Sequence, residues 1–252
     1  MSRALLLVER NLMIYRHTWA VLAAEVLEPL LYLLSIGVGV GALVGSVPGV
    51  DPDIGYAQFV APALLATAAM NGAMNETSFG LYFKLRHERT YDTMVTTPLT
   101  VRDIALGETA WALLRGAVAS GGFLAVVAVL GYARSPWILL ALPGAALVGF
   151  AFAAAGLAVA TFLRDPGDFQ LIQLVMLPMF LFATTFFPVT VYPRPLQWLV
   201  EALPLYHAIQ LLREPALGHV GPALLPSVAY LLAFGALALA VALPRLRRAL
   251  LA

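Results

Sequence analysis

Six long apolar stretches, separated by short polar segments, dominate the pattern of hydrophobic and polar positions along the chain. A helix needs about 20 apolar residues to cross about 30 Å of hydrocarbon, and each stretch has roughly that length. No stretch shows the period of two that is typical of a membrane β-barrel. The stretches cover residues 20–44, 57–80, 104–130, 137–162, 169–189 and 222–243. Because backbone groups in lipid must bond to each other, the pattern predicts an all-α integral membrane protein with six transmembrane helices.

The first 18 residues follow a different pattern. Polar residues gather at 2–3, 9–11 and 16–18, and large apolar residues fill the positions between them. This spacing predicts an N-terminal amphipathic helix over residues 1–18 that lies in the membrane interface. The alternative is a plain extension of the first span.

Prolines interrupt the apolar segment that follows the fifth stretch. Proline removes a backbone donor and breaks a helix, so one continuous helix is excluded here. The prolines are Pro188, Pro193, Pro195 and Pro204. Aromatic residues such as Trp198 favour the headgroup region. We therefore expect short re-entrant helices over residues 188–205 on the external side.

Composition narrows the class of protein further. The chain has 252 residues, of which 61% are hydrophobic and 12% charged, whereas soluble domains carry about 25% charged residues. With a net charge of +1, the chain also lacks the basic field of a nucleic-acid binder. The absence of cysteine excludes disulfides and thiolate metal sites.

The basic residues are distributed unevenly between the two predicted sides. One side holds Arg3, Arg10, Arg16, Lys84, Arg86, Arg89, Arg102, Arg164, Arg245, Arg247 and Arg248, and the other Arg134, Arg194 and Arg213. Basic loops stay on the cytoplasmic side of a membrane. We therefore expect a multi-pass protein of the bacterial inner (plasma) membrane with both termini in the cytoplasm.

Catalytic patterns are missing from the sequence. Lys84 lacks the glycines and the Ser or Thr of a phosphate-binding loop. His87-Glu88 begins like a zinc-protease helix, but Tyr91 replaces the second histidine. We expect no catalytic residue, metal or cofactor in this chain. If the protein is a pump, its energy source lies on another chain.

Several charged residues fall within the predicted spans. They are Glu25, Glu28, Glu76, Glu108 and Arg115. Arg115 lies roughly 18 Å along its helix from the membrane surface, near mid-bilayer, where an isolated charge is costly. We expect a carboxylate partner, with Glu76 and Glu108 as candidates. A structural ion pair and a role in transport both fit this pattern.

Small and polar residues suggest two further features. Gly37, Gly41 and Gly45 repeat every four residues, which favours close helix packing, with subunit contact or motion as the alternative. The later spans are apolar and aromatic with scattered polar groups, which predicts a path for an amphiphile rather than for a small ion. Candidate path residues are Gln170, Gln173, Phe180, Thr184, Thr185 and Phe187.

The charged loop after the second span predicts a short helix over residues 91–96. Thr90 is suited to cap it and Pro98 to end it, and helical spacing places Tyr91 and Met94 on one apolar side. Such a helix invites a protein partner, although a loop that lies on lipid headgroups is the simpler alternative.

The chain resembles the ABC-2 type transporter permeases, most closely the nodulation protein J branch of lipo-oligosaccharide exporters and the actinobacterial drug exporters. The resemblance rests on TYDTMVTTPLTVRDIALGE, FFPV and LPLYHAIQLLREPALGH, together with YRHTW, LYLLSIGVGVG and FVAPALLA. It covers nearly the whole chain and implies a single ABC-2 transmembrane domain over residues 1–252.

This resemblance implies roles for three segments. Residues 1–18 would be a connecting helix, 188–205 the re-entrant helices, and 84–100 the loop that couples the permease to an ATPase. The coupling residues would be Glu88, Arg89, Thr90, Tyr91, Met94, Thr97 and Pro98. The family works as dimers of permease subunits, here most simply a homodimer, with ATP and Mg²⁺ bound by partner ATPase subunits.

Taken together, these features predict the permease subunit of an ATP-driven exporter for a lipid-linked oligosaccharide or a hydrophobic drug. Its partners would be an ATPase subunit, a second permease subunit and membrane lipids, but no nucleic acid. One alternative is a secondary transporter or channel driven by an ion gradient, with Glu76, Glu108 and Arg115 as a relay. Another is a membrane-embedded enzyme that modifies lipids.

Overall fold

The computed structural model describes residues 3–15, 19–44, 47–86 and 100–251. Every regular element within these ranges is helical, in agreement with the predicted fold class. The longer helices are α1 (Arg3–Tyr15), α2 (Trp19–Tyr32), α3 (Tyr56–Asn75), α6 (Val101–Val129), α7 (Ala141–Ala160), α8 (Phe169–Phe182), α10 (Pro204–Ala216) and α11 (Leu225–Leu251). The shorter ones are α4 (Leu81–Arg86) and α9 (Arg194–Glu201).

Short segments of other helical types join or precede these helices. Two π-helical segments, Leu33–Val40 and Glu76–Gly80, continue α2 and α3 directly. Single turns of 3₁₀-helix occur at Pro136–Leu140, Pro166–Asp168, Val189–Val191 and Pro222–Leu224. As a result, one unbroken helical rod extends from Tyr56 to Arg86, beyond the predicted span end at residue 80.

The six apolar stretches all contain a helix, but not all of these helices are long and apolar enough to cross a membrane. Among the described residues, four helical segments are long and apolar enough: Ala20–Val40, Val101–Val129, Pro136–Ala160 and Pro222–Arg248. The segment Pro166–Phe182 is apolar but shorter. α3 is not among the four, because polar residues such as Gln58 and Asn71 lower its hydropathy, and most of its side chains are buried against other helices. The count of six spans therefore stays a prediction.

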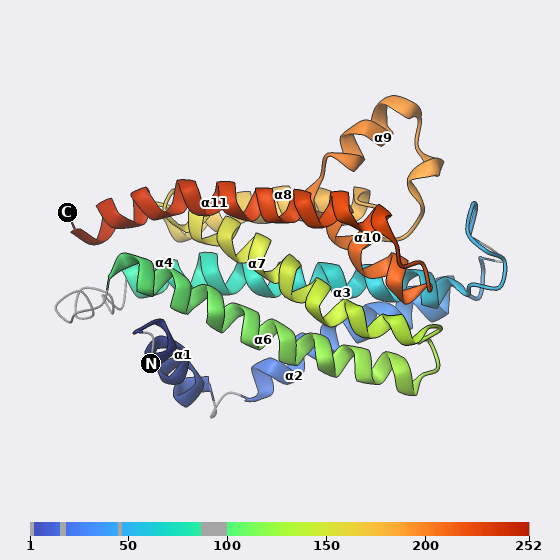
Figure 1. Ribbon diagram of the computed structural model, residues 1–252, viewed down its shortest axis with the longest axis horizontal. Helices are drawn as coiled ribbons and strands as arrows, with labels where there is room; N and C mark the ends of the chain where they lie inside the picture. Colours follow the sequence, from blue (N-terminus) through green and yellow to red (C-terminus); the bar gives the residue numbers. More distant parts are fainter. Residues whose placement is uncertain (1–2, 16–18, 45–46, 87–99, 252) are drawn as a thin grey trace.

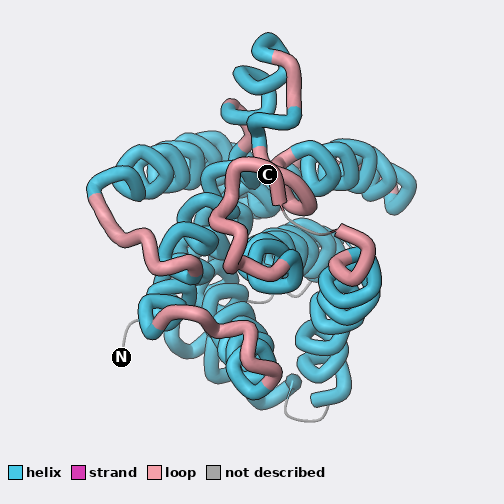
Figure 2. The backbone as a smooth tube through the Cα atoms, turned by 90° about the vertical axis from the view of Figure 1, so that its right-hand side faces the viewer, coloured by secondary structure: helices cyan, strands magenta, loops and turns pink. Residues whose placement is uncertain are grey.

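α3 is the central helix of the bundle and packs against α6, α7 and α10. Viewed along the bundle in Figure 2, the helices lie around one another, and one arm stands apart at the top. Small residues let the helix backbones approach closely. A Cβ atom added to Gly156 of α7 would collide with the side chain of Thr77, and one added to Gly235 of α11 would lie 2.7 Å from Phe150.

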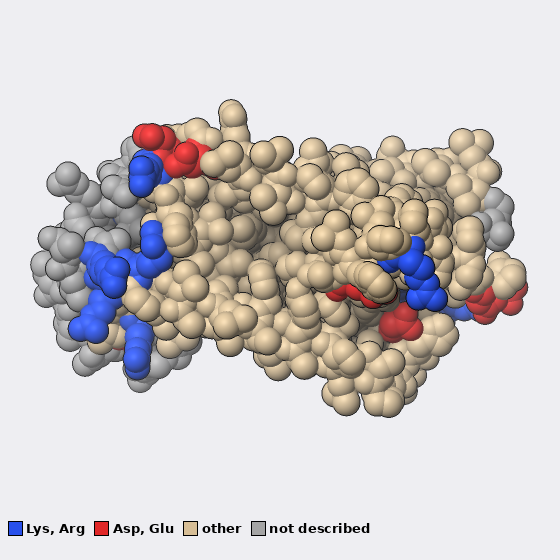
Figure 3. All heavy atoms as spheres, turned by 90° about the horizontal axis from the view of Figure 1, so that it is seen from above, with Lys and Arg blue, Asp and Glu red and all other residues tan. Residues whose placement is uncertain are grey.

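The bundle has two distinct ends. The first turn of α1, the last turn of α11 and helix α4 gather at one end, here called the terminal end, whereas α9 and α10 lie at the opposite end (Figure 1). Lys and Arg side chains cluster at the terminal end of the face in Figure 3, and an uncharged band separates them from charges at the opposite end. This band is what the hydrocarbon layer of a membrane requires. The cytoplasmic assignment of the terminal end stays a prediction.

The turn between α7 and α8 lies at the terminal end. The carboxylate of Asp168 accepts hydrogen bonds from the backbone N–H groups of Arg164, at 2.7 Å, and Asp165, at 3.2 Å. These bonds favour the ionised form, so the pKa of Asp168 lies below its usual range.

Proline-rich residues after α8 form a separate arm. α9 begins directly after Pro193 and α10 begins at Pro204, so the prolines start these helices rather than interrupt them. α9 stands away from the bundle in Figures 1 and 2, and Trp198 on it is 70% exposed. The helical character of residues 188–205 agrees with the sequence, while their entry into a membrane stays a prediction.

Candidate functional site

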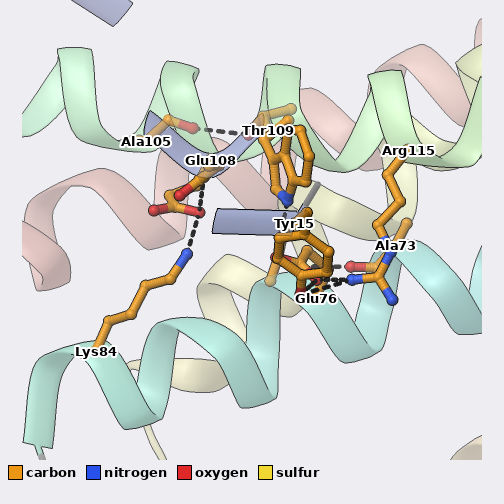
Figure 4. Close-up of polar contacts among 11 residues, drawn as sticks. Tyr15, Ala73, Glu76, Lys84, Ala105, Glu108, Thr109 and Arg115 are labelled. Atoms are coloured by element: carbon orange, nitrogen blue, oxygen red, sulfur yellow. Dashed lines mark hydrogen bonds and ion pairs between the residues drawn. The ribbon is translucent and has the colours of Figure 1, made fainter. Parts of the chain in front are cut away.

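A charged cluster of Arg115, Glu76, Glu25 and Tyr15 lies inside the bundle. Figure 4 shows Arg115, Glu76 and Tyr15 of this cluster. Arg115 extends from α6 and forms ion pairs with Glu76 and Glu25. Tyr15 of α1 donates its hydroxyl proton to Glu76 at 3.2 Å and accepts a hydrogen bond from Arg115 at 2.9 Å. The indole N–H of Trp111 donates to the other Glu76 oxygen at 3.1 Å. The cluster therefore joins α1, α2 and α6 to the start of the π-helical segment after α3.

The partner of Arg115 is one of the two carboxylates that the sequence suggested. Arg115 forms ion pairs with Glu76 and with Glu25. Glu108 lies two turns away on α6 and pairs with a different basic residue. Lys84, expected in a loop, lies on α4 and reaches Glu108 at 2.7 Å, as Figure 4 shows. Asn11 of α1 donates a further hydrogen bond to Glu108 at 3.4 Å.

These contacts explain how charges persist inside an apolar bundle. Glu108 is 2% exposed and Glu76 is 9% exposed, and burial of a carboxylate at such a depth is costly unless it is paired and hydrogen-bonded. Each meets a basic group and at least one further hydrogen-bond donor. Two such groups of contacts attach α1 to the bundle, through Asn11 and Tyr15.

A cleft of about 690 Å³ opens beside the charged cluster, between α2, α3, α6 and α8. Its polar wall includes Glu28 and Asn75, in addition to the charged cluster. Its apolar wall includes Leu64 of α3, Phe123 of α6 and Met176 of α8. Glu76 and Leu64 are 12 residues apart, about 18 Å along the helix, so the lining changes from polar to apolar along the bundle.

The predicted path residues separate into two groups. Gln173 and Phe180 line this cleft. Gln170 is exposed on α8 outside the lining, and the ring of Phe187 packs against Tyr192. Thr184 and Thr185 are buried beyond the end of α8, and neither lines the cleft. The role of these four residues in a path stays a prediction.

Thr184 and Thr185 instead contact a residue that sequence reasoning placed among external loop charges. Arg213 of α10 is only 4% exposed and lies inside the bundle. Its guanidinium donates to the carbonyl oxygens of Thr184 at 2.8 Å, Thr185 at 3.2 Å and Phe59 at 3.1 Å. It also lies over the Phe59 ring, 3.8 Å from the centroid. Only a weak signal for this burial is present in the sequence, because Leu211 and Leu212 precede Arg213 but Glu214 follows it directly.

The glycine stripe is only partly covered by the described residues. Gly37 lies in a π-helical segment, and a Cβ added there would be 3.4 Å from the Cα of Ala57, so it lets α3 approach. Gly41 directly follows that segment, and Gly45 is outside the described residues. Gly37 therefore takes part in packing within the chain.

The predicted coupling residues lie outside the described residues, namely Glu88, Arg89, Thr90, Tyr91, Met94, Thr97 and Pro98. Their described neighbours are α4, which ends at Arg86, and the N-terminus of α6. Thr100 caps α6, since its hydroxyl accepts a hydrogen bond from the backbone N–H of Asp103 at 3.2 Å.

Comparison with known proteins places these features in context. Residues 3–217 match the family described as ABC-2 type transporter. The chain is 39% identical over 201 residues to Nodulation protein J of Rhizobium leguminosarum bv. trifolii, covering 79% of this chain and 75% of that protein. It is 34% identical over 227 residues to Nodulation protein J of Neorhizobium galegae, covering 89% and 82%. For the same protein of Azorhizobium caulinodans the identity is 30%, covering 88% of each chain.

Proposed function

Because the chain belongs to the ABC-2 type transporter family, and is thus an ABC transporter permease in a membrane rather than an enzyme, we propose that it exports an amphiphile from the cell. The substrate would be a lipid-linked oligosaccharide or a hydrophobic drug. The resemblance to the lipo-oligosaccharide exporters favours the first.

The observation that carries this proposal is the change of lining along the cleft. Its polar wall offers charges and amides, such as Asn75, whereas Leu64 and Phe123 offer an apolar surface about three turns away. An amphiphile matches both walls at once. A free sugar would lose water against the apolar wall without compensating hydrogen bonds.

The energy for export would come from a partner ATPase that binds ATP and Mg²⁺. The sequence supports this division, since it contains no phosphate-binding loop. The loop of residues 84–100 would dock on the ATPase, and two permease subunits would form the path between them. Residues 1–18 would lie in the interface as the connecting helix.

An ion-gradient-driven transporter is the second candidate, with Glu76, Glu108 and Arg115 as a relay. It is favoured by the buried charges themselves, which are rare inside membranes without a function. The contacts around them argue for the first candidate. Each named charge is already paired with a neighbouring helix, as a structural connection would be.

Transport by reconstituted vesicles tests the proposal directly. Vesicles with this chain and its partner ATPase are loaded in turn with a labelled glycolipid, a hydrophobic dye and a simple sugar. We expect ATP-dependent movement of the glycolipid or the dye. Movement of the sugar alone would overturn the proposal, and movement driven by an ion gradient without ATP would favour the second candidate.

Two substitutions in the loop test the expected coupling. Tyr91→Ala and Met94→Asp should leave ATP hydrolysis intact while transport falls, because both residues belong to the predicted docking face. Leu139→Ala, at an exposed position in the 3₁₀ turn before α7, is the control and should leave transport unchanged. Transport at the normal rate in both loop variants would exclude docking through these residues.

A further inference from the structure

The cleft carries an excess of negative charge. Its acidic side chains are Glu25, Glu28 and Glu76, and Arg115 is the one basic side chain that lines it within the described part of the chain. Arg115 is already engaged by Glu25 and Glu76. Glu28 has no ion pair or hydrogen bond among the described residues, and its side chain is exposed to the cleft. One wall of the cleft therefore presents a carboxylate with no counter-ion.

Aromatic rings lie close to this carboxylate. Tyr32 is four residues after Glu28 on α2, so the two side chains share one face of the helix. The Tyr32 ring lies 6.1 Å from the Phe180 ring of α8, and both rings line the cleft. Aromatic faces attract cations, and a carboxylate next to them strengthens the preference for positive charge.

A buried hydroxyl in the same cleft also lacks a partner. Ser120 of α6 is 3% exposed, lines the cleft and forms no hydrogen bond within the described chain. A hydroxyl at a cleft wall without a partner in the chain is available to a polar atom of a bound group. The amides of Asn71 and Gln173 line the cleft as well and likewise form no side-chain hydrogen bond with another described residue.

We propose that this cleft selects amphiphiles whose headgroup carries a protonated amine, with Glu28 as its counter-ion. The inference rests on the proposed export function and names the chemical class of its substrate. The ammonium group would lie between Glu28, Tyr32 and Phe180, and the remaining polar atoms of the headgroup would reach Ser120 and Gln173. The hydrocarbon part would lie against the apolar wall.

A matched pair of probes tests the charge preference. The probes are two fluorescent single-chain amphiphiles that differ only in the headgroup, which is a primary amine in one and the N-acetylated amine in the other. Binding is measured at equilibrium with the full-length permease in lipid nanodiscs at pH 7. We expect the amine to bind at least 10-fold more tightly, and Glu28→Gln to remove this difference while binding of the neutral probe stays the same.

Three variants serve as controls. Glu28→Asp keeps the charge and should retain most of the preference, whereas Glu201→Gln removes a glutamate outside the cleft and should change nothing. Ser120→Ala should weaken the binding of both probes by a similar factor, since a hydroxyl recognises polar atoms rather than charge. Equal binding of the two probes, or a preference that persists in Glu28→Gln, would overturn the inference.

Transport by the complex of permease and ATPase separates this inference from the export function. If the amine probe is exported faster than its neutral counterpart and Glu28→Gln abolishes the difference, both proposals stand. If neither probe moves with ATP while the binding preference persists, export is refuted and the cleft assignment remains. If both probes move at equal rates and bind equally, export stands and the amine preference fails.

Discussion

Two arginines are buried in different parts of the same bundle, and they are stabilised in opposite ways. Arg115 lies beside the cleft, between the carboxylates of Glu25 and Glu76. Arg213 lies at the opposite end against three carbonyl oxygens and an aromatic ring, with no carboxylate within ion-pair distance among the described residues. The first is neutralised by charge, and the second is solvated by backbone dipoles.

The difference concerns what each arginine holds together. Arg115 joins side chains from three separate helices, so these helices depend on a balance of charges. Arg213 holds the chain where α8 ends, and there Thr184 adopts a positive φ of 64°, which is uncommon for a residue with a Cβ. Ion pairs therefore stabilise the helix packing beside the cleft, whereas hydrogen bonds to backbone carbonyl groups stabilise the opposite end of the bundle.

Removal of Arg115 should have the largest effect. Arg115→Ala leaves Glu25 and Glu76 buried without a cation, and a broken buried ion pair commonly costs about 3–5 kcal/mol. We expect poor expression or a large fall in the melting temperature of the purified protein in detergent. The double variant Arg115→Ala/Glu76→Gln should recover part of the loss. Normal expression and melting of Arg115→Ala would contradict the charge-based account.

Removal of Arg213 should have a smaller effect of a different kind. Arg213→Ala deprives carbonyl groups of a charged donor, and such hydrogen bonds contribute about 1.5–3 kcal/mol each, offset by the cost of burying the guanidinium. The melting temperature should fall, and no single Glu→Gln change should restore it. Arg213→Met, which fills a similar volume without a charge, should lie closer to wild type. Rescue by neutralising a carboxylate would show that Arg213 is part of an ion pair.

Loss of one hydroxyl in the charged cluster should have a modest effect. Tyr15→Phe removes hydrogen bonds to Glu76 and Arg115 but no charge, and we expect a loss of about 1 kcal/mol, seen as a slightly lower melting temperature. Tyr192→Phe, whose hydroxyl donates to the Phe182 carbonyl at 3.3 Å at an exposed site, is the matched control and should be nearly neutral. An equal fall in melting temperature in both variants would mean that the hydrogen bonds of Tyr15 in the cluster stabilise the fold no more than an exposed hydrogen bond does.

An exposed carboxylate should have the smallest effect and one that depends on pH. The pKa of Asp168 is lower in the folded chain than in the unfolded chain, so its stabilisation is present above the unfolded pKa and is lost as pH falls through the folded pKa. Asp168→Asn should therefore melt slightly below wild type at pH 7, with the gap closing in acid. A gap that is constant with pH would show that charge is not involved.

The helices were predictable in the long apolar stretches, where composition alone favours a membrane-spanning helix. Lipid demands long apolar helices, and a run such as residues 137–162 has few alternatives. Helix boundaries were less predictable, because the rod that starts at Tyr56 continues past Gly80 to Arg86 through a mixture of apolar and basic residues. That continuation follows from contacts with other helices, such as Lys84 with Glu108, which a linear sequence does not display.

The site was predictable only in part. The cost of an isolated charge predicted a carboxylate for Arg115, and the structure provides two. Glu108 pairs with Lys84 instead of Arg115 because α4 places Lys84 beside it. This placement depends on how the helices pack, which the sequence does not display. Arg213 escaped detection because a basic residue near a chain segment rich in prolines resembles a loop charge. The cleft forms where four helices pack together, so no local sequence pattern predicts it.

The π-helical segment Glu76–Gly80 has a consequence for how this gene can tolerate change. A π turn accommodates one more residue than an α turn, so it offsets the side chains that follow by about 100°. Deletion of one codon between Thr77 and Gly80 would return the rod to regular α-helix and leave Lys84 facing Glu108, because it removes the extra residue of the π turn. Single-codon deletions there should therefore be tolerated better than single-codon deletions within the regular part of α3, which would rotate every side chain of α4 by about 100° around the rod.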